Sequence, residues 1–257
     1  MRKLDNSLLD IGYLGYRFVT PIIDPLTSVR NLLSYPKYVK QLLTYSSMKQ
    51  AEKISLINLF PVLADSTKTS PFDSHYFYQD IWASKKIYSS KTKAHYDIGS
   101  NIEYVGFLST FTKVKFIDIR PIEAQLSNFE SIEGDILHLQ FKSNSLRSLS
   151  CLHVAEHIGL GRYGDPLDTE GTKKACAELS RVLARDGNLY FSLPVGKPRV
   201  CFNAHRIHSP KQILEYFPKL KLVEFSGIDD NGLFVQNVKP SSFSKYNYAC
   251  GLFHFTK

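Results

Sequence analysis

The chain has 257 residues, of which 43% are hydrophobic, and its formal net charge at pH 7 is +8. This length fits one domain with an extension or two small domains. The apolar runs fall short of the ~18 residues that a spanning helix requires, and the N-terminus lacks the apolar stretch of a signal peptide. A membrane-spanning protein and a secreted one are therefore not expected.

The positive charge is concentrated in the N-terminal third, where residues 1–93 hold 13 Lys and Arg against 7 Asp and Glu. This excess indicates an anionic partner there, such as a membrane surface, a phosphate-bearing substrate or another protein, unless it is only a solvated lysine-rich helical face. Nucleic acid is not expected, because the sequence has no RNP, zinc-finger or helix-turn-helix signature.

The four cysteines, at positions 151, 176, 201 and 250, match no zinc or CxxC spacing. Reduced thiols in a core are the expected state, which is typical of a cytoplasmic protein. Together with the basic N-terminal third, this predicts a cytoplasmic location with peripheral contact at the inner face of the membrane.

Residues 1–93 predict a helical N-terminal extension that prolines divide into short helices. These prolines are at positions 21, 25, 36 and 61. Apolar residues fall near helical spacing in two segments, namely Leu8, Leu9, Ile11 and Leu14, and then Tyr38, Leu42, Leu43 and Tyr45. A further helix is expected over residues 72–88, with residues 91–93 as the hinge.

Residues 94–257 predict a separate domain in which strands alternate with helices, so its sheet is mostly parallel. The expected strands are residues 94–98, 114–119, 131–135, 147–153, 187–193, 221–227 and 251–256. The expected helices are residues 101–111, 121–127, 171–184 and 209–216. The fold class is therefore α/β, with a doubly wound, seven-stranded Rossmann-like sheet that ends in an antiparallel hairpin.

Polar residues follow the first four of these strands, where a doubly wound sheet binds its ligand. Asp97, Gly99 and Ser100 end the first strand, and glycine allows a tight turn close to the ligand. Asp118 ends the second strand, where its carboxylate would accept hydrogen bonds from ribose hydroxyls. The third and fourth strands contribute the remaining candidates for cofactor binding: Asp135, Ile136, His153 and Glu156.

This order of acids and strands resembles that of class I S-adenosylmethionine-dependent methyltransferases, whose sheet also ends in an antiparallel hairpin. Finer features resemble a bacterial family catalogued as domain of unknown function 268, which is associated with surface-polysaccharide genes. The matching segments are residues 72–80, 153–165 and 202–206, and the resemblance covers roughly residues 70–257. It implies S-adenosylmethionine as the cofactor and a sugar hydroxyl of a surface polysaccharide, or of its lipid-linked precursor, as the methyl acceptor.

The first loop departs from the acid-x-Gly-x-Gly-x-Gly pattern of that superfamily. Asn101 stands at the second glycine and Glu103 at the third. Asn tolerates a left-handed backbone better than most residues, so the turn can be kept. The departure raises the alternative of a non-catalytic binding protein with a degraded cofactor pocket.

The acceptor is expected to meet the loops that follow the fourth and fifth strands. His157 and His205 are the candidate general bases, with Asp165 behind them, because histidine can take a proton near neutral pH. Arg162, Tyr163, Asn203 and Arg206 are the candidate substrate contacts, although both segments could also be plain connections. On the preceding helix, His75, Tyr76 and Gln79 could close over the cofactor or simply pack on the core.

Two other enzyme classes are weaker interpretations. His153-Val-Ala-Glu156-His157 matches the H-x-x-E-H motif of zinc peptidases, but His153 follows a predicted strand and does not lie on a helix. A nucleotide-dependent oxidoreductase or epimerase would need a Tyr-x-x-x-Lys pair after the fourth strand, which the sequence lacks there. No metal-ligand cluster is evident, although Asp165 and Asp168 could bind a divalent ion.

Overall fold

The computed structural model describes residues 12, 15–20 and 22–257, and the chain forms two compact units, Met1–Pro71 and Phe72–Lys257. The second unit begins with helix α3 (Ser74–Ser90), although the sequence predicts this helix as part of the N-terminal extension. Trp82, Ala83 and Ile87 of α3 are buried in a core cluster together with strand residues. Helix α3 is therefore part of the sheet domain.

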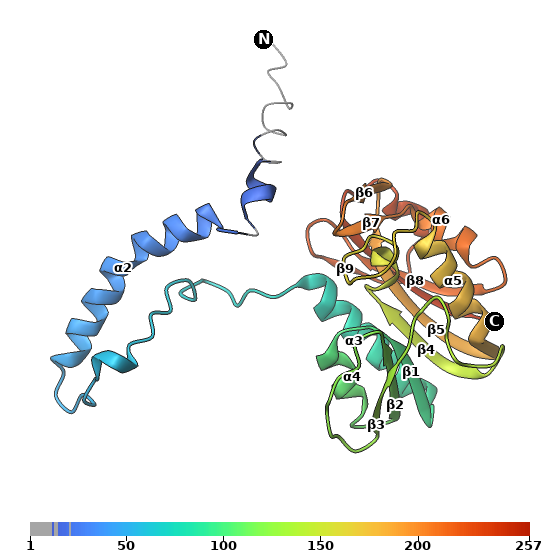
Figure 1. The fold of residues 1–257 in the computed structure, drawn as a ribbon, viewed down its shortest axis with the longest axis horizontal. Coiled ribbons are helices and arrows are strands. Elements are labelled where there is room, and N and C mark those ends of the chain that lie inside the picture. Colours follow the sequence, from blue (N-terminus) through green and yellow to red (C-terminus); the bar gives the residue numbers. More distant parts are fainter. Residues whose placement is uncertain (1–11, 13–14, 21) are drawn as a thin grey trace, which may run out of the picture. The chain divides into compact units, whose positions relative to one another are not determined.

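The first unit contains a 22-residue helix, α2 (Pro25–Ser46), and a short 3-10 helix, η1 (Leu56–Asn58) (Figure 1). Asp24 caps α2 by accepting hydrogen bonds from the backbone N–H groups of Leu26, at 3.1 Å, and Thr27, at 3.2 Å. The expectation that Pro36 separates two helices is wrong, because Pro36 lies inside α2. The helix is exposed, so water can serve the Leu32 carbonyl that the proline leaves without a donor.

The predicted apolar pattern at Leu8, Leu9, Ile11 and Leu14 lies outside the described residues. In the part of the chain that the structure covers, no helix is both long enough and apolar enough to cross a membrane.

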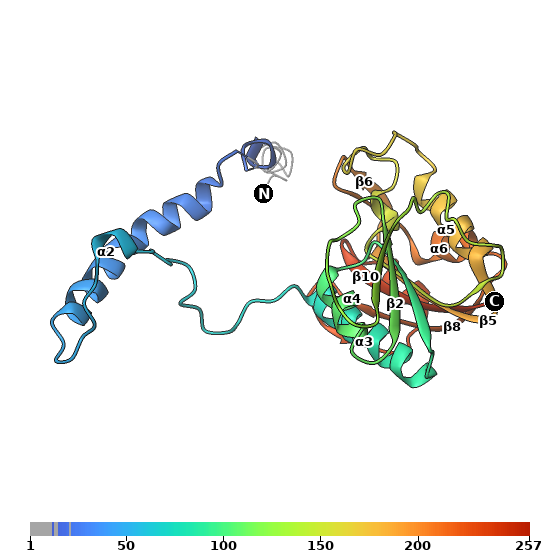
Figure 2. The same ribbon diagram turned by 60° about the horizontal axis from the view of Figure 1, so that its bottom comes forward.

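The second unit is built on an eight-stranded sheet with the order β3-β2-β1-β4-β5-β10-β8-β9 (Figure 2). Strands β1 (Ala94–Ile98), β2 (Lys113–Asp118), β3 (Phe129–Glu133), β4 (Leu146–Leu152) and β5 (Leu183–Val195) pair in parallel. Strand β10 (Ala249–Thr256) pairs antiparallel with both β5 and β8 (Lys221–Ile228). The doubly wound sheet with a C-terminal antiparallel hairpin is thus confirmed.

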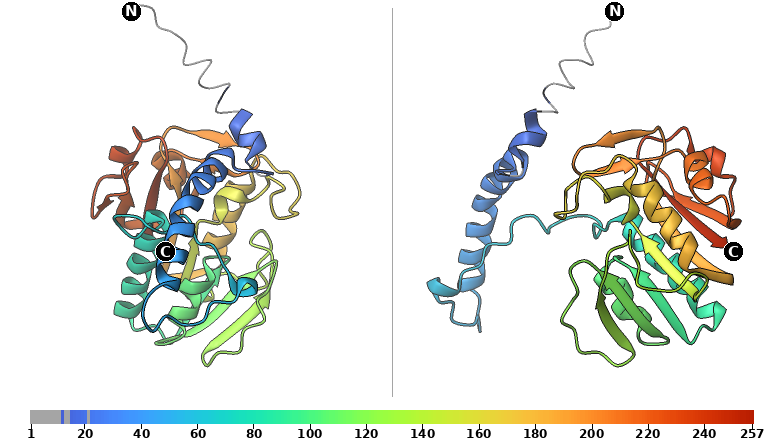
Figure 3. Two further views of the ribbon diagram at one scale, coloured as in Figure 1. Left: turned by 90° about the vertical axis from the view of Figure 1, so that its left-hand side faces the viewer. Right: turned by 45° about the vertical axis from the view of Figure 1, so that its right-hand side comes forward.

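Helices cover both faces of this sheet (Figures 2 and 3). On one face, α3 and α4 (Ile102–Leu108) bury Trp82, Val105 and Leu108 against strand residues. On the other face, α5 (Gly171–Val182) and α6 (Pro210–Tyr216) pack on a larger cluster that includes several phenylalanines whose rings contact one another. The strands are buried on both sides, as is usual for a parallel sheet.

Three details differ from the expected elements. The helix predicted over residues 121–127 does not form, because β3 starts at Phe129 and the intervening chain is irregular, with the Ile122 N–H bound by the Ser131 hydroxyl at 2.9 Å. Strand β9 (Phe234–Val235) adds an eighth strand, and β6 (Arg199–Cys201) pairs with β7 (His205–Ile207) in a separate ribbon. The remaining short elements are η2 (Ala155–His157) and η3 (Pro240–Phe243).

The strand order reverses between β1 and β4, since the chain passes from β1 outward through β2 and β3 and then returns to β4. Ligands of open α/β sheets bind outside the carboxyl ends of the strands at this reversal. The segments there follow Ile98, Asp118 and Leu152, which are the last residues of β1, β2 and β4.

Candidate functional site

The loop after β1 is held by a buried carboxylate. Asp97 is 0% exposed and accepts hydrogen bonds from the Ser100 backbone N–H at 3.0 Å, the Ser100 hydroxyl at 2.8 Å and the Ser150 hydroxyl. The Ser100 hydroxyl in turn accepts a bond from the Leu152 N–H at 3.0 Å. Burial raises the pKa of Asp97 to about 6 against the lowering effect of these bonds. Asp97 therefore ties the end of β1 to β4.

The turn itself depends on Gly99, whose φ is +65°. A Cβ atom at this position would lie 3.3 Å from Asp118 Oδ2 and 3.2 Å from a Val154 methyl group, so the backbone passes close to the end of β2. Asn101 has a φ of −57° and caps α4 by accepting a hydrogen bond from the Glu103 N–H at 2.9 Å. Asn101 therefore needs no glycine conformation, and its presence leaves the turn intact.

Two adjoining cavities open at the carboxyl ends of the strands. The larger, about 850 Å³, is bounded by Gly99 to Glu103 and by the segments after β2 and β4. The smaller, about 450 Å³, reaches from Gly99 to the loop after β3. Six residues border both cavities, which makes the two spaces contiguous: Gly99, Asp118, Arg120, His153, His157 and Tyr163.

Asp118 lies where the two cavities meet. One carboxylate oxygen, Oδ1, accepts a hydrogen bond from the Arg120 backbone N–H at 2.7 Å, and the other faces Gly99. The side chain of Asp118 is 19% exposed, so a ligand can reach it. Asp118 is the last residue of β2, which is the place that the sequence predicts for an acid at the cofactor site.

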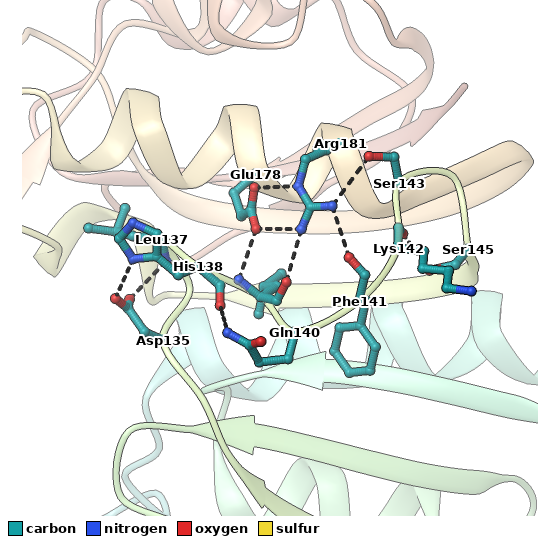
Figure 4. A network of polar contacts seen from close by, with 11 residues as sticks. Asp135, Leu137, His138, Gln140, Phe141, Lys142, Ser143, Ser145, Glu178 and Arg181 are labelled. Carbon is teal, nitrogen blue, oxygen red and sulfur yellow. Dashed lines mark hydrogen bonds and ion pairs between the residues drawn. The ribbon is translucent and has the colours of Figure 1, made fainter.

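Asp135 and Ile136 border the smaller cavity and begin a loop that a polar network attaches to α5 further along (Figure 4). Asp135 Oδ1 accepts a hydrogen bond from the Leu137 N–H at 2.8 Å. Arg181 donates to the carbonyls of Leu139 and Phe141, both at 2.9 Å, and pairs with Glu178 at 2.7 Å. The loop after β3 is therefore fixed to α5.

The larger cavity contains a carboxyl group that is buried without a hydrogen bond. Glu156 is 0% exposed, and neither of its oxygens has a hydrogen-bond partner in the described part of the chain. Burial raises the pKa of Glu156 to about 8, so the group is mostly protonated at neutral pH. A buried polar group in this state is expected to bind something that reaches the cavity.

His157 lies beside this carboxyl group, with its Nε2 atom 3.6 Å from Glu156 Oε1. A 2.6 Å contact between His157 Nδ1 and the Ala204 carbonyl places the ring proton on Nδ1, which leaves the Nε2 lone pair toward Glu156. Burial lowers the pKa of His157 to about 4, so the ring is neutral. The two side chains can share or pass a proton.

The structure brings most of the predicted site residues together around the two cavities. The larger is lined by Gly99, Ser100, Asp118, His153, Glu156, His157, Arg162, Tyr163 and His205. The predicted site residues that line only the smaller are Asp135, Ile136 and Asp165. The guanidinium groups of Arg120 and Arg162 lie over the Tyr163 ring, at 4.7 and 5.1 Å from its centroid.

Four predicted residues have other positions or contacts. Asp97 lines neither cavity and orders the loop behind them. The Asp165 carboxylate is engaged by the N–H groups of Gly159, at 2.6 Å, and Tyr163, at 3.3 Å, so it shapes its own loop. Arg206 is buried and donates to the carbonyls of Ile158 and Asp168, which removes it from a substrate-clamping position. Asn203 is exposed and lines neither cavity.

Sequence reasoning missed Arg120 and Tyr248, which both line the larger cavity. Arg120 could have been found from its position two residues after the acid of β2. Tyr248 precedes β10 in an irregular segment, and no local pattern marks it. It reaches the cavity because β10 lies next to β5 in the sheet. The centroid of its ring lies 5.1 Å from that of His205 and 5.2 Å from that of His75.

Comparisons with known proteins agree with this architecture. A family model described as Caenorhabditis protein of unknown function, DUF268, matches residues 110–233, which include two of the three resembling segments but not residues 72–80. No curated protein matches the sequence. The expected bacterial origin of that family is not supported by the description of its model.

Two solved structures show the fold. An N-methyltransferase, NodS, from Bradyrhizobium japonicum, in complex with S-adenosyl-L-homocysteine, is similar at a TM-score of 0.50 and 17% identity, covering 73% of this chain and 88% of that one. A putative sarcosine dimethylglycine methyltransferase from Galdieria sulphuraria is similar at a TM-score of 0.52 and 12% identity, covering 70% and 85%. The second unit therefore has the Rossmann-like fold of S-adenosylmethionine-dependent methyltransferases.

Proposed function

We propose that the protein is a methyltransferase that uses S-adenosylmethionine and methylates a hydroxyl group. The observation that carries the proposal is that the cavity space at the strand ends is continuous between two sets of residues. One region of this space is bordered by the turn at Gly99 and the acids Asp118 and Asp135, and the other region by the buried pair Glu156 and His157. A donor and an acceptor can thus be bound side by side, which is the main requirement of this reaction.

The residues at the strand ends fit the cofactor. Gly99 lets the backbone approach a ligand, Asp118 offers a carboxylate to ribose hydroxyls, and Asp135 and Ile136 offer an acceptor and an apolar surface to an adenine ring. When bound, S-adenosylmethionine supplies a methyl group already activated by its sulfonium. The chain has to orient the two reactants and receive the proton of the acceptor.

Glu156 and His157 supply that proton path. Above its pKa of about 8, Glu156 is a carboxylate that can accept the hydroxyl proton directly, and His157 Nε2 lies 3.6 Å from Glu156 Oε1, on the same side of the cavity. This differs from the prediction that His157 and His205 act as bases with Asp165 behind them. Burial raises the pKa of Glu156 to about 8 but lowers that of His157 to about 4, and Asp165 is engaged by backbone N–H groups.

A sugar is the proposed carrier of the hydroxyl, in a surface polysaccharide or its lipid-linked precursor. The larger cavity combines aromatic rings, those of Tyr76, Tyr163 and Tyr248, with hydrogen-bonding groups, a lining that suits a ring with apolar faces and polar edges. This part of the proposal also draws on the resemblance of residues 72–80, 153–165 and 202–206 to a family associated with such polymers.

Calorimetric titration of the full chain with S-adenosylmethionine and S-adenosylhomocysteine, with NAD as control, tests the proposal first. Micromolar binding of the first two and none of NAD is expected. Binding of NAD alone, or of none of the three, would contradict a methyltransferase and favour an oxidoreductase or a non-catalytic binding protein, respectively.

The helix α2 supports a second proposal, a peripheral contact with an anionic lipid surface. Its exposed apolar residues Leu32, Val39 and Leu43 follow helical spacing, and Arg30 and Lys37 fall on the opposite side by the 3.6-residue period. The helix contains no Asp or Glu. Exposed apolar and basic side chains on one helix are typical of binding in the membrane interface.

Co-sedimentation of the full chain with vesicles tests this contact. Binding to vesicles that contain phosphatidylglycerol, weakened by salt and by Leu43→Asp but unaffected by Leu167→Asp on the exposed loop before α5, would support it. Equal binding to uncharged vesicles would contradict the contact with anionic lipid and favour a purely apolar association with membranes. A dimer in solution that Leu43→Asp disrupts would also contradict it and favour self-association through α2.

A further inference from the structure

Three side chains of the kinds that bind transition metals converge beside the cavities, and the methyltransferase proposal gives none of them a chemical role. They are His75 in the first turn of α3, His153 directly after β4 and Cys250 in β10. One potential ligand atom from each lies within 4.8 Å of the others. Their exposed fractions are 9%, 8% and 0%, so the cluster is buried.

The orientation of His153 prepares one of its nitrogens for a ligand. Its Nδ1 atom lies 2.8 Å from Gln79 Oε1, which also accepts a hydrogen bond from the Ser192 hydroxyl at 2.6 Å. Since this oxygen only accepts, His153 Nδ1 carries the proton and Nε2 carries the lone pair. His153 Nε2 is buried and has no hydrogen-bond partner among the described residues.

This arrangement is the one found around metal-binding histidines, which donate their second ring N–H to a carbonyl or carboxylate oxygen that fixes the ring. Without an ion, the structure leaves the lone pair of a buried nitrogen unused, which is costly. A cation at Nε2 removes that cost. The unpartnered atom is an observation independent of the clustering of the three side chains.

The surrounding charges favour a cation. Burial is the main influence on the pKa of Cys250, which it raises well above the usual value, and the carboxyl groups of Glu156, Asp73 and Asp80 add to this effect. Burial lowers the pKa of His75, and the charges of Asp73 and Asp230 oppose that lowering. A dication would be attracted by the carboxylates of Asp73 and Asp230 and would hold Cys250 as a thiolate, because metal binding releases the thiol proton to solvent.

The ligand types select the metal. Two neutral imidazoles and one thiolate suit zinc, whereas magnesium and calcium require oxygen ligands. Zinc sites with three protein ligands leave a fourth position to water or substrate. A cavity of about 320 Å³ that is lined by His75 and His153 gives the ion a route of entry.

We propose that His75, His153 and Cys250 bind one zinc ion. Neither the H-x-x-E-H motif nor any local spacing indicates this set, because its members come from three distant parts of the chain. Glu156 and His157, the other members of that motif, remain with the acceptor site.

The test uses the full chain after removal of metal by a chelator. Zinc is then added in competition with a chromophoric chelator, and cobalt is used in parallel as a spectroscopic substitute. We expect one zinc per chain, together with a thiolate-to-cobalt charge-transfer absorption and the strong visible bands of four-coordinate cobalt. Zinc affinity should fall at least tenfold in His75→Gln and in Cys250→Ser.

Cys201→Ser is the matched control, since Cys201 lies in β6 and outside the cluster. It should bind zinc like the parent chain. Thermal unfolding of each metal-free variant shows whether that variant still folds. The cobalt spectrum is recorded on the parent chain, so this part of the test does not require any variant to fold. Absence of stoichiometric zinc binding, a cobalt spectrum without the thiolate band, or unchanged affinity in His75→Gln would overturn the proposal.

Discussion

The two sides of the strand-end cavities differ in how their polar groups are satisfied. On the side of β1, β2 and β3, the carboxylates of Asp97, Asp118 and Asp135 each accept hydrogen bonds from backbone N–H groups of their own loops. On the side that follows β4, Glu156 and the Nε2 atom of His153 are buried without such partners in the described structure. The carboxylates on the first side have hydrogen-bond partners before any ligand binds, whereas the buried groups on the second side would gain partners only from a ligand.

This contrast indicates which side chains can act on a reactant. Groups with satisfied hydrogen bonds fix the shape of a site, and buried groups without partners are the ones available to a reactant or an ion. Variants on the acceptor side should therefore act mainly on the reaction. Those on the cofactor side should act on cofactor binding or on the free energy of unfolding.

The largest effect is expected from Glu156→Gln. We expect kcat to fall on the order of 100-fold above pH 8, because general bases contribute about this much or more. In the metal-free parent chain, kcat should rise with pH through about 8 as Glu156 loses its proton. The measurement is initial rate against pH at saturating S-adenosylmethionine.

Glu215→Gln, which removes an exposed carboxylate of α6, is the control for this variant and should keep the parent profile. If Glu156→Gln retains a rate that still rises through pH 8, another group is the base. The contrast between the two sides would then be structural only.

Asp118→Ala should come next. Loss of hydrogen bonds to a carboxylate costs about 1.5–3 kcal/mol, so the affinity for S-adenosylmethionine should fall roughly 10- to 100-fold. Calorimetry measures the change, and Glu133→Ala at the end of the neighbouring strand is the control, since Glu133 lines neither cavity. Equal affinities in the two variants would remove Asp118 from the cofactor site.

Arg181→Ala tests whether the cofactor side is ordered before binding. The variant loses the bonds from Arg181 to the carbonyls of Leu139 and Phe141. We expect the free energy of unfolding to fall by about 1 kcal/mol, since the Arg181–Glu178 pair is partly exposed and therefore screened. Denaturant unfolding with and without S-adenosylmethionine measures both the stability of the variant and its affinity for the cofactor. If the free energy of cofactor binding falls by more than the free energy of unfolding, the loop is ordered by the ligand.

Asn101→Gly should have the smallest effect. It restores the glycine expected at this position of the loop, but Asn101 has an ordinary backbone and caps α4. Replacing an asparagine cap with glycine costs only a few tenths of a kcal/mol, and cofactor affinity should stay the same. Tighter binding of S-adenosylmethionine by the variant would show that the asparagine does obstruct the site.

The sequence by itself determined the doubly wound sheet and the acids at its edge. Strand and helix periodicity are local properties, and the carboxyl ends of parallel strands meet at one edge, so Asp118 and Asp135 could be placed from the chain alone. The prediction for residues 121–127 is wrong. The short helical pattern there does not form a helix, and this segment instead connects β2 to β3, which pairs with β2. Such short patterns are overridden by tertiary contacts.

Only the tertiary structure decided which side chains became buried and which of them met. The insertion of β10 between β5 and β8 brings Cys250 and Tyr248 close to His75, which precedes both of them by more than 150 positions. The burial that raises the pKa of Glu156, and the loop contacts that engage Arg206, likewise depend on packing between distant segments. No local pattern encodes these encounters, because desolvation and metal-ligand geometry arise only when the chain has folded.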